Sequence, residues 1–422
     1  MTPNAWAERS LHLLRRSLAI VFVGLVLSSG SRAEEQEKPK VRSIGPDDST
    51  QTSAVVIVPS SMNLAHTAQF LPLDERGSIV GPERAAEQAT VVLDRLEAAL
   101  KAAGSGLDRV VKVNVYAARA DVLPTFRTVF KARMTGQARP AVTFVIGVLA
   151  HPEALVAIDA IAETPESVRP LAPAPAGQRS GAPLAILPAG ARVYVSGQAE
   201  PSMDLAEATR GTLKSLGKTL AYLGLDKSHV VQLKAFLEPM SAAAVVEREM
   251  TAFFGAGAVP PLVYVEWRSG STVPIEIELI ARAGPRTDLT VVEALTPTGM
   301  KASPVFSKVV RVNRGHLVYL SGLYGPPHAK GTEQVEAIFK TLEKLLAETG
   351  SDFRHLAKAT YYVTDDEASR ALNDLRPKYY DAKIPPAASK AIVPGVGADG
   401  TTVTLDMIGV TVPIEASPTP PK

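Results

Sequence analysis

The chain repeats one short phrase three times, as DRVVKVNVY at residues 108–116, SHVVQLKAFL at residues 228–237 and RHLAKATYYV at residues 354–363. Each copy alternates apolar side chains with others, which is typical of a β-strand. Each also follows a glycine, at Gly104, Gly224 or Gly350. These glycines stand roughly 120 residues apart, which is the length of a domain rather than of a small solenoid repeat. The sequence therefore predicts three copies of one domain.

Each glycine ends a run of apolar residues at helical spacing. The runs comprise Val91, Leu93, Leu96 and Leu100, then Leu213, Leu216, Leu220 and Leu223, then Phe339, Leu342, Leu345 and Leu346. Glycine adopts the left-handed cap conformation without strain, so each run predicts a helix that stops there. Second helices are expected at residues 123–134, 243–254 and 371–380, with further strands around them. Each copy is thus an α+β unit whose helices cover one face of a sheet.

The opposite face of each sheet also needs cover, and the other two copies supply it if the three sheets pack around a pseudo-threefold axis. We therefore expect an intramolecular pseudo-trimer with a central β-barrel and its helices outside. A monomer would then act as its own trimer. The expected order is a signal peptide (1–33), a flexible lead-in (34–52), repeat 1 (53–163), a Pro/Ala-rich linker (164–181), repeat 2 (182–283), a linker (284–303), repeat 3 (304–411) and a flexible tail (412–422).

The N-terminus indicates export. Arg15 and Arg16 precede an apolar run at 18–27, and the small residues Ser31 and Ala33 fit a cleavage site. An uncleaved anchor is the alternative, but the run is shorter than the ~20 residues of a spanning helix. We expect a periplasmic or extracellular protein with no membrane segment after cleavage near Glu34.

Composition excludes several classes of function. The formal net charge of +2, from 45 basic and 43 acidic residues, provides no basic field for nucleic acid. Cysteine is absent, which removes thiolate chemistry. The seven histidines show no metal-ligand spacing, so no metal is expected. No phosphate-binding loop or GxSxG elbow is present, and no cofactor is expected.

Three stretches carry a resemblance to a known family. VYVSGQAEP (193–201), the helix and strand of residues 87–121, and PIEIELIA (274–281) resemble the RidA (YjgF) family of imine and enamine deaminases, in older naming endoribonuclease L-PSP. The resemblance covers residues 53–163, 182–283 and 304–411. It implies a chorismate-mutase-like α+β fold, with ligand clefts between neighbouring repeats in place of neighbouring subunits.

The resemblance also implies catalytic residues. The family's arginine, which grips a substrate carboxylate, falls in a P-A-R segment and matches Arg139, with Leu262 and Ala387 at that position in the other repeats. The family's glutamate, which handles a proton, matches Glu276. Ordinary alternatives are a surface ion pair for Arg139 and a simple polar sheet face for Glu276.

Further cleft residues follow from the same resemblance. They are Ser196 and Gly197 in repeat 2 and Ser321, Gly322, Asn373 and Phe306 in repeat 3. The Ser-Gly pairs would bind substrate through their turns, Asn373 would line the cleft from the second helix, and Phe306 would supply an aromatic ring. Serine and glycine also satisfy turn geometry without any ligand, and asparagine bonds to its own backbone.

Two functions remain open. The first is an exported deaminase that hydrolyses small 2-imino or enamine acids to 2-oxo acids and ammonia. The alternative is a catalytically degenerate protein of the same fold that binds a small carboxylate-bearing molecule or serves as a scaffold. A ribonuclease function follows from the family's older name alone and lacks a basic groove.

Overall fold

The computed structural model describes residues 40–136, 139–165, 167, 181–268, 273–286 and 290–412. The expected signal peptide, most of the linker at 164–181 and most of the tail lie outside the described residues. Within the described part, no helix is long and apolar enough to cross a membrane.

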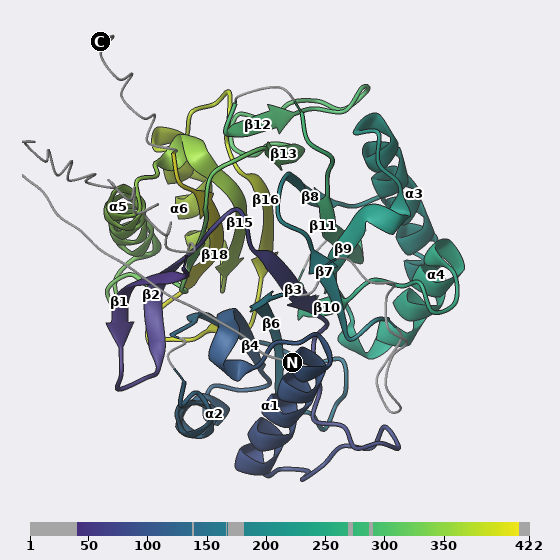
Figure 1. The fold of residues 1–422 in the computed structure, drawn as a ribbon, viewed down its shortest axis with the longest axis vertical. Coiled ribbons are helices and arrows are strands. Elements are labelled where there is room, and N and C mark those ends of the chain that lie inside the picture. The colour runs from purple at the N-terminus through teal and green to yellow at the C-terminus, as the bar shows by residue number, and fades with distance from the viewer. Residues whose placement is uncertain are drawn as a thin grey trace, which may run out of the picture. The chain divides into compact units, whose positions relative to one another are not determined.

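The described residues form two α-helices in each repeat, and each pair lies beside the sheet of its own repeat (Figure 1). The helices are α1 (Ala85–Ala102), α2 (Val122–Arg133), α3 (Leu205–Tyr222), α4 (Ala243–Phe254), α5 (Gly331–Glu348) and α6 (Asp366–Leu375). Short 3-10 turns occupy Leu107–Arg109, Lys227–His229, Met240–Ala242, Phe353–His355 and Arg376–Lys378.

The glycine caps are confirmed in all three repeats. Gly104, Gly224 and Gly350 have φ of 67°, 69° and 73°, in the left-handed region. In each case the following residue donates its N–H to a carbonyl in the last turn of the helix, as Ser105 does to Leu100 at 2.9 Å. This Schellman geometry satisfies the carbonyls at the helix end and turns the chain toward the next strand.

The described strands form three open sheets of six strands each. Sheet 1 has the order β17 (Gly395–Val396), β5 (Ala141–Ile146), β4 (Val110–Ala117), β6 (Val156–Thr164), β3 (Asn63–Thr67), β7 (Leu184–Leu187). Sheet 2 has the order β10 (Leu262–Glu266), β9 (Val230–Leu237), β11 (Ile275–Arg282), β8 (Arg192–Gln198), β13 (Val309–Val312), β12 (Val292–Leu295). Sheet 3 has the order β1 (Arg42–Asp47), β2 (Thr52–Val58), β14 (Leu317–Leu320), β18 (Val403–Val410), β15 (Leu356–Val363), β16 (Ala387–Ile392).

Each sheet receives a strand from the next repeat. Strand β7 of repeat 2 pairs with β3 of repeat 1, β13 of repeat 3 pairs with β8 of repeat 2, and β2 of repeat 1 pairs with β14 of repeat 3. All three pairings are antiparallel. The exchange runs in a ring, so β1 and β2, the first described strands, complete the sheet of the last repeat.

The inner faces of the sheets share one hydrophobic cluster, as expected of a pseudo-trimer. Val111, Val231 and Ala357 stand at the same position in β4, β9 and β15, and all three are buried in it. The outer faces pack against the helices in separate clusters. The three-repeat α+β arrangement is therefore confirmed.

In the described residues the three sheets do not join into a closed barrel, which corrects that part of the expectation. At two seams, where the sheets of neighbouring repeats meet, a few backbone hydrogen bonds and a serine hydroxyl stand in place of a continuous strand ladder. Ser196 Oγ accepts from the Ala388 N–H at 2.7 Å and donates to the Ser307 carbonyl at 2.5 Å. Ser321 Oγ does the same with the Val142 N–H and the Ser53 carbonyl, at 2.8 and 2.6 Å.

Three segments differ from the sequence expectation. The lead-in contains β1 and the linker at 284–303 contains β12. Both are edge strands, and their side chains, most of which are exposed or half-exposed, gave no strong pattern. The second helix of repeat 3 begins at Asp366, because Asp365 caps it by accepting from the Ala368 N–H, and it ends before Pro377.

The seam serines generate a stability prediction. We expect Ser196→Ala and Ser321→Ala each to lower the free energy of unfolding by about 1–3 kcal/mol, because each leaves a backbone N–H and a carbonyl without their partner. Urea unfolding would measure this, with Ser61→Ala in the exposed turn between β2 and β3 as the control. Equal stability of all three variants would contradict a seam role.

Candidate functional site

The seam between repeats 2 and 3 gathers polar side chains around Glu276. This seam is called the 2–3 junction below. Glu276 lies on β11 directly against Gly197 of β8, where an added Cβ would stand 1.8 Å from its Oε1. The hydroxyl of Ser389, on β16 of repeat 3, hydrogen-bonds to Glu276 and accepts from the Gly197 N–H at 3.2 Å. Gly197 therefore leaves the space that the Glu276 carboxylate occupies.

Two lysines of repeat 3 surround this carboxylate. Lys308 Nζ lies 4.5 Å from the centroid of the Phe306 ring. Lys390 Nζ donates to Ser369 Oγ at 2.8 Å and to Asn373 Oδ1 at 3.3 Å. The 2–3 junction thus brings together most of the residues expected from the sequence, which are Glu276, Ser196, Gly197, Phe306 and Asn373.

The electrostatics of the junction favour proton transfer near neutral pH. Burial raises the pKa of Glu276 to about 7, although the Ser389 hydrogen bond and the charges of Lys308 and Lys390 oppose the rise. Burial also lowers the pKa of both lysines, against the pull of the Glu276 charge. An acid whose pKa lies near the working pH can both accept and release a proton.

The junction between repeats 1 and 2 is filled by a side chain. There Gln69 stands at the position that Gly197 occupies in repeat 2 and Gly322 in repeat 3. The backbone shows this, because the Gln69 N–H donates to the Leu262 carbonyl just as the Gly322 N–H donates to the Val142 carbonyl. The Gln69 amide donates to the Tyr264 carbonyl at 2.9 Å and accepts from the Tyr264 N–H at 3.4 Å.

The junction between repeats 3 and 1 contains Gly322 but is also filled. The hydroxyl of Tyr324 lies beside Gly322 together with that of Thr404, which stands at the position of Glu276. A Cβ added at Gly322 would lie 2.9 Å from Thr404 Oγ1 and 3.2 Å from the Tyr324 hydroxyl. Ser321 and Gly322 therefore lie at a different junction from Glu276.

Arg139 lies apart from these residues. Its guanidinium pairs with Asp48 at 2.7 Å and donates to the Gly136 carbonyl at 2.7 Å. The cavity that it lines includes Asp108, Arg109 and Glu163, and all the residues around this cavity belong to repeat 1 or its lead-in.

The strand register corrects the alignment behind the Arg139 assignment. Ala141 pairs with Lys112, and Ala387 pairs with the equivalent Lys358, so the counterpart of Ala387 is Ala141 rather than Arg139. The residue that follows Pro-Ala, where the family has its arginine, is Val142 in repeat 1 and Ala388 in repeat 3. Repeat 2 has Leu262 at this register position, because Leu262 pairs with Leu233 as Val142 pairs with Val113.

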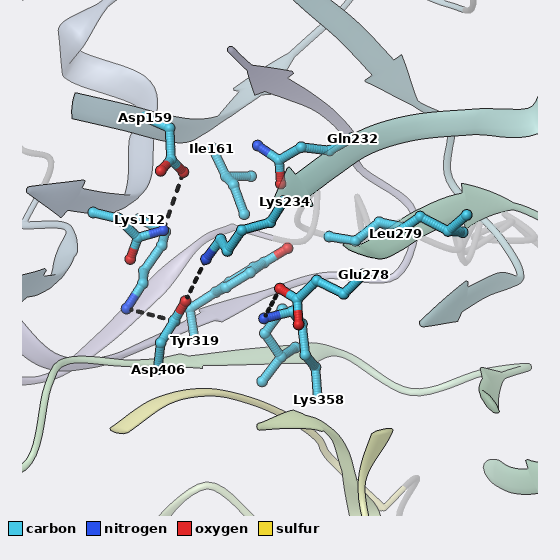
Figure 2. Close-up of a pocket in the computed structure, with 13 residues that line it drawn as sticks. Lys112, Asp159, Ile161, Gln232, Lys234, Glu278, Leu279, Tyr319, Lys358 and Asp406 are labelled. Carbon is cyan, nitrogen blue, oxygen red and sulfur yellow. Dashed lines mark hydrogen bonds and ion pairs between the residues drawn. The ribbon is translucent and has the colours of Figure 1, made fainter. Parts of the chain in front are cut away.

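A second polar cluster lies on the inner faces of the sheets (Figure 2). It contains three acids at one equivalent position of β6, β11 and β18 and three lysines of β4, β9 and β15, all buried. They are Asp159, Glu278, Asp406, Lys112, Lys234 and Lys358. This set is called the axial cluster below.

The charges of the axial cluster pair across repeats. Asp406 of repeat 3 contacts Lys112 of repeat 1 at 3.1 Å and Lys234 of repeat 2 at 3.4 Å. Lys358 of repeat 3 contacts Glu278 of repeat 2 at 2.9 Å. Although burial alone would raise it, the charges of the three lysines hold the pKa of Asp406 well below its usual range.

The axial acids and lysines therefore neutralise one another, which makes this cluster structural. Asp159, whose pKa is raised by burial, accepts from Tyr116 at 2.7 Å and from Asn114 at 3.0 Å. In the described part of the chain, no group of three His, Asp or Glu side chains could hold a metal ion.

Sequence reasoning missed Ser389, Lys390 and Lys308 at the 2–3 junction. The stretch PPAASKAI carries a usable signal, because its alternation puts Ala388 and Lys390 on the same face of one strand. Lys308 directly precedes β13, the strand that repeat 3 adds to the sheet of repeat 2. Its closeness to Glu276 follows from that pairing.

The axial cluster generates a stability prediction. We expect Asp406→Asn to lower the free energy of unfolding by about 3–5 kcal/mol, because it leaves Lys112 and Lys234 buried without their shared partner. Denaturant unfolding would measure this. The control is Asp94→Asn, which removes an exposed pair with Arg133 and should cost at most about 1 kcal/mol. An Asp406→Asn cost as small as that of the control would contradict the pairing.

Glu276 generates a pH prediction. The folded protein binds its proton with a pKa of about 7, against 4.5 for an ordinary glutamate. Between these values the folded state holds a proton that the unfolded state has lost, so this group makes the free energy of unfolding fall as pH rises. We expect Glu276→Gln to remove this fall, so that its stability relative to the parent protein increases with pH across that window. Denaturant unfolding at several pH values would measure it, and the exposed control Glu153→Gln should show a pH-independent difference.

Comparisons with known proteins agree with the three repeats. A family model described as endoribonuclease L-PSP matches residues 46–164, 172–283 and 297–410. Among curated proteins, the protein DfrA of Myxococcus xanthus is 28% identical over 117 residues, which is 26% of this chain and 88% of that protein.

Several solved structures each match about 30% of this chain. A putative endoribonuclease (TM0215) of Thermotoga maritima is 27% identical, with a TM-score of 0.23, over 30% of this chain and 99% of its own. The Rid family protein YyfB of Yersinia pestis is 26% identical, with a TM-score of 0.27, over 30% and 99%. The YjgF family member NMB1025 of Neisseria meningitidis is 20% identical, with a TM-score of 0.22, over 29% and 96%. Because the three model matches together span most of its length, the chain belongs to the endoribonuclease L-PSP family, the RidA or YjgF family, as three tandem repeats.

Proposed function

We propose that the 2–3 junction binds a small 2-imino or enamine acid and hydrolyses it to the 2-oxo acid and ammonia. The observation that carries the proposal is the partly buried Glu276 carboxylate, with a pKa of about 7, set against Gly197 and faced by two lysines. Gln69 and Tyr324 fill the other two junctions, so the 2–3 junction is the candidate among the described residues.

Lys390 is the proposed carboxylate anchor. It would replace the family's arginine, whose position is occupied by Ala388 in repeat 3. Its amine is held by the neutral oxygens of Ser369 and Asn373, which leaves its positive charge available to an anion. The charge-assisted hydrogen bond would be worth on the order of 1.5–3 kcal/mol.

Glu276 is the proposed proton-transfer group. As the carboxylate it takes a proton from the water that adds to the imine carbon, and as the acid it gives a proton to the departing ammonia. An imine is already electrophilic, so the protein has mainly to position it beside water. This modest requirement is compatible with the loss of the family's arginine.

We also propose that the protein works outside the cytoplasm. The support is the sequence of the N-terminus alone, where two arginines, a short apolar run and small residues precede Glu34.

A binding function without turnover is the second candidate. The apolar residues Val142, Leu262 and Ala388 at the family's arginine position favour it, since each junction lacks that anchor. In that case the 2–3 junction would hold a small carboxylate-bearing molecule and leave it unchanged.

Turnover distinguishes the two. We expect the full chain to release 2-oxo acid and ammonia from a 2-imino acid, generated in situ by an amino-acid oxidase, faster than the spontaneous rate. Glu276→Gln should lower the rate by about 10²–10⁴-fold, because it removes the proton-transfer group. Gly197→Ala should lower it too, because its Cβ would displace the Glu276 carboxylate.

The matched control is Gly217→Ala on α3, where an added Cβ meets nothing closer than 3.5 Å. It should retain the parent rate. Release no faster than the spontaneous rate by the parent protein would overturn the deaminase proposal and leave the binding function.

A further inference from the structure

Lys308 differs from the other lysines near the axis and the 2–3 junction in its surroundings. The axial lysines each contact a carboxylate, and Lys390 is held by two side-chain oxygens. Among the described residues, Lys308 Nζ has no hydrogen bond or ion pair and lies over the Phe306 ring instead. Its amine is therefore not committed to an oxygen acceptor.

The surroundings of Lys308 act on its charge in two directions. The side chain is half-buried, and burial lowers its pKa, whereas the Glu276 charge and the face of the Phe306 ring favour the ammonium. A lysine that has lost part of its hydration carries an unprotonated, nucleophilic fraction closer to neutral pH. Glu276 is the nearby group that can take the proton from its ammonium.

The position is fixed by the backbone. The Lys308 carbonyl accepts from the Ser196 N–H at 3.0 Å, and the preceding Ser307 carbonyl accepts from Ser196 Oγ. The exchanged strand thus holds Lys308 at the seam that contains Gly197 and Glu276. Glu276, Lys308, Lys390 and Phe306 all remain partly exposed, so a small solute can reach them.

We propose that Lys308 Nζ is a nucleophile that forms a Schiff base with the C2 carbon of a small 2-oxo or 2-imino acid bound at the 2–3 junction. This proposal takes its substrate class from the proposed function. It adds a covalent route to the proposed hydrolysis. In enzymes generally, an unprotonated lysine amine forms this kind of bond with carbonyl substrates.

The atoms balance in both directions. With a 2-imino acid, the Lys308 amine adds to C2, and the C2–N bond to the original nitrogen breaks, which releases ammonia and leaves the imine on Lys308. Water then adds to C2, the bond to Lys308 Nζ breaks, and the 2-oxo acid leaves with the free amine restored. With a 2-oxo acid, the amine adds to C2 and one water leaves. Glu276 carries the protons, and no oxidant or reductant is consumed.

Borohydride trapping with pyruvate tests the proposal. Reduction converts the Schiff base into a stable secondary amine, which intact-mass measurement and peptide mapping of the full chain will locate. We expect Lys308 to be labelled well above every other lysine. Labelling should persist in Lys301→Arg, an exposed lysine before the exchanged strand, and disappear in Lys308→Arg, which keeps the positive charge.

Peptide mapping of the parent protein decides the matter even if Lys308→Arg does not fold. Label spread evenly over surface lysines, or absent from Lys308, would overturn the proposal. The two proposals fail separately. Turnover without a Lys308 adduct would remove the covalent route and keep the deaminase, whereas an adduct without turnover would support the nucleophile and count against the deaminase.

Discussion

The exchange of first strands between neighbouring repeats is the constraint on which the rest of this structure depends. No repeat completes its own sheet, because β2, β7 and β13 each extend the sheet of another repeat. The same exchange brings Phe306 and Lys308 of repeat 3 to the Glu276 of repeat 2. Both the core and the candidate site are thus properties of the whole ring rather than of any one repeat.

Fusion of three copies into one chain lets equivalent positions diverge. In a trimer of identical subunits, the axial position of Asp159, Glu278 and Asp406 would meet its own copies. Here Asp406 instead meets lysines of two other repeats, and Lys358 meets Glu278. The junctions have diverged in the same way, since Gln69 and Tyr324 fill two of them while Gly197 leaves room for Glu276 in the third.

The parts of the fold that follow from local chemistry could be predicted from the sequence. Helical spacing and the caps at Gly104, Gly224 and Gly350 located the first helices, and alternation located the strands after them. The strand exchange could not be predicted, because the alternation of β13 is the same whether it pairs within its own repeat or with β8. The edge strands β1 and β12 were not predicted either, because most of their side chains are exposed or half-exposed and carry little hydrophobic pattern.

The candidate site was predicted in part. Glu276, Gly197, Asn373 and Phe306 meet at one junction, whereas Arg139 was misplaced because its P-A-R alignment was shifted relative to the strand register. A short motif cannot fix a register when one residue of slip exchanges the two faces of a strand. Lys308 and Lys390 can be recognised as site residues only when the strand registers of repeats 2 and 3 are both known.

The seam hydrogen bond from Ser321 to Ser53 spans 268 residues, and it also bears on how the chain folds. The first described hairpin has no strand to pair with along β2 until the last repeat has been synthesised and its β14 strand has formed. Contacts of such high sequence separation slow folding, because a long loop must close before they form. Ring closure is therefore the late step, and until then the apolar strand β2 is an unpaired edge that can join another chain.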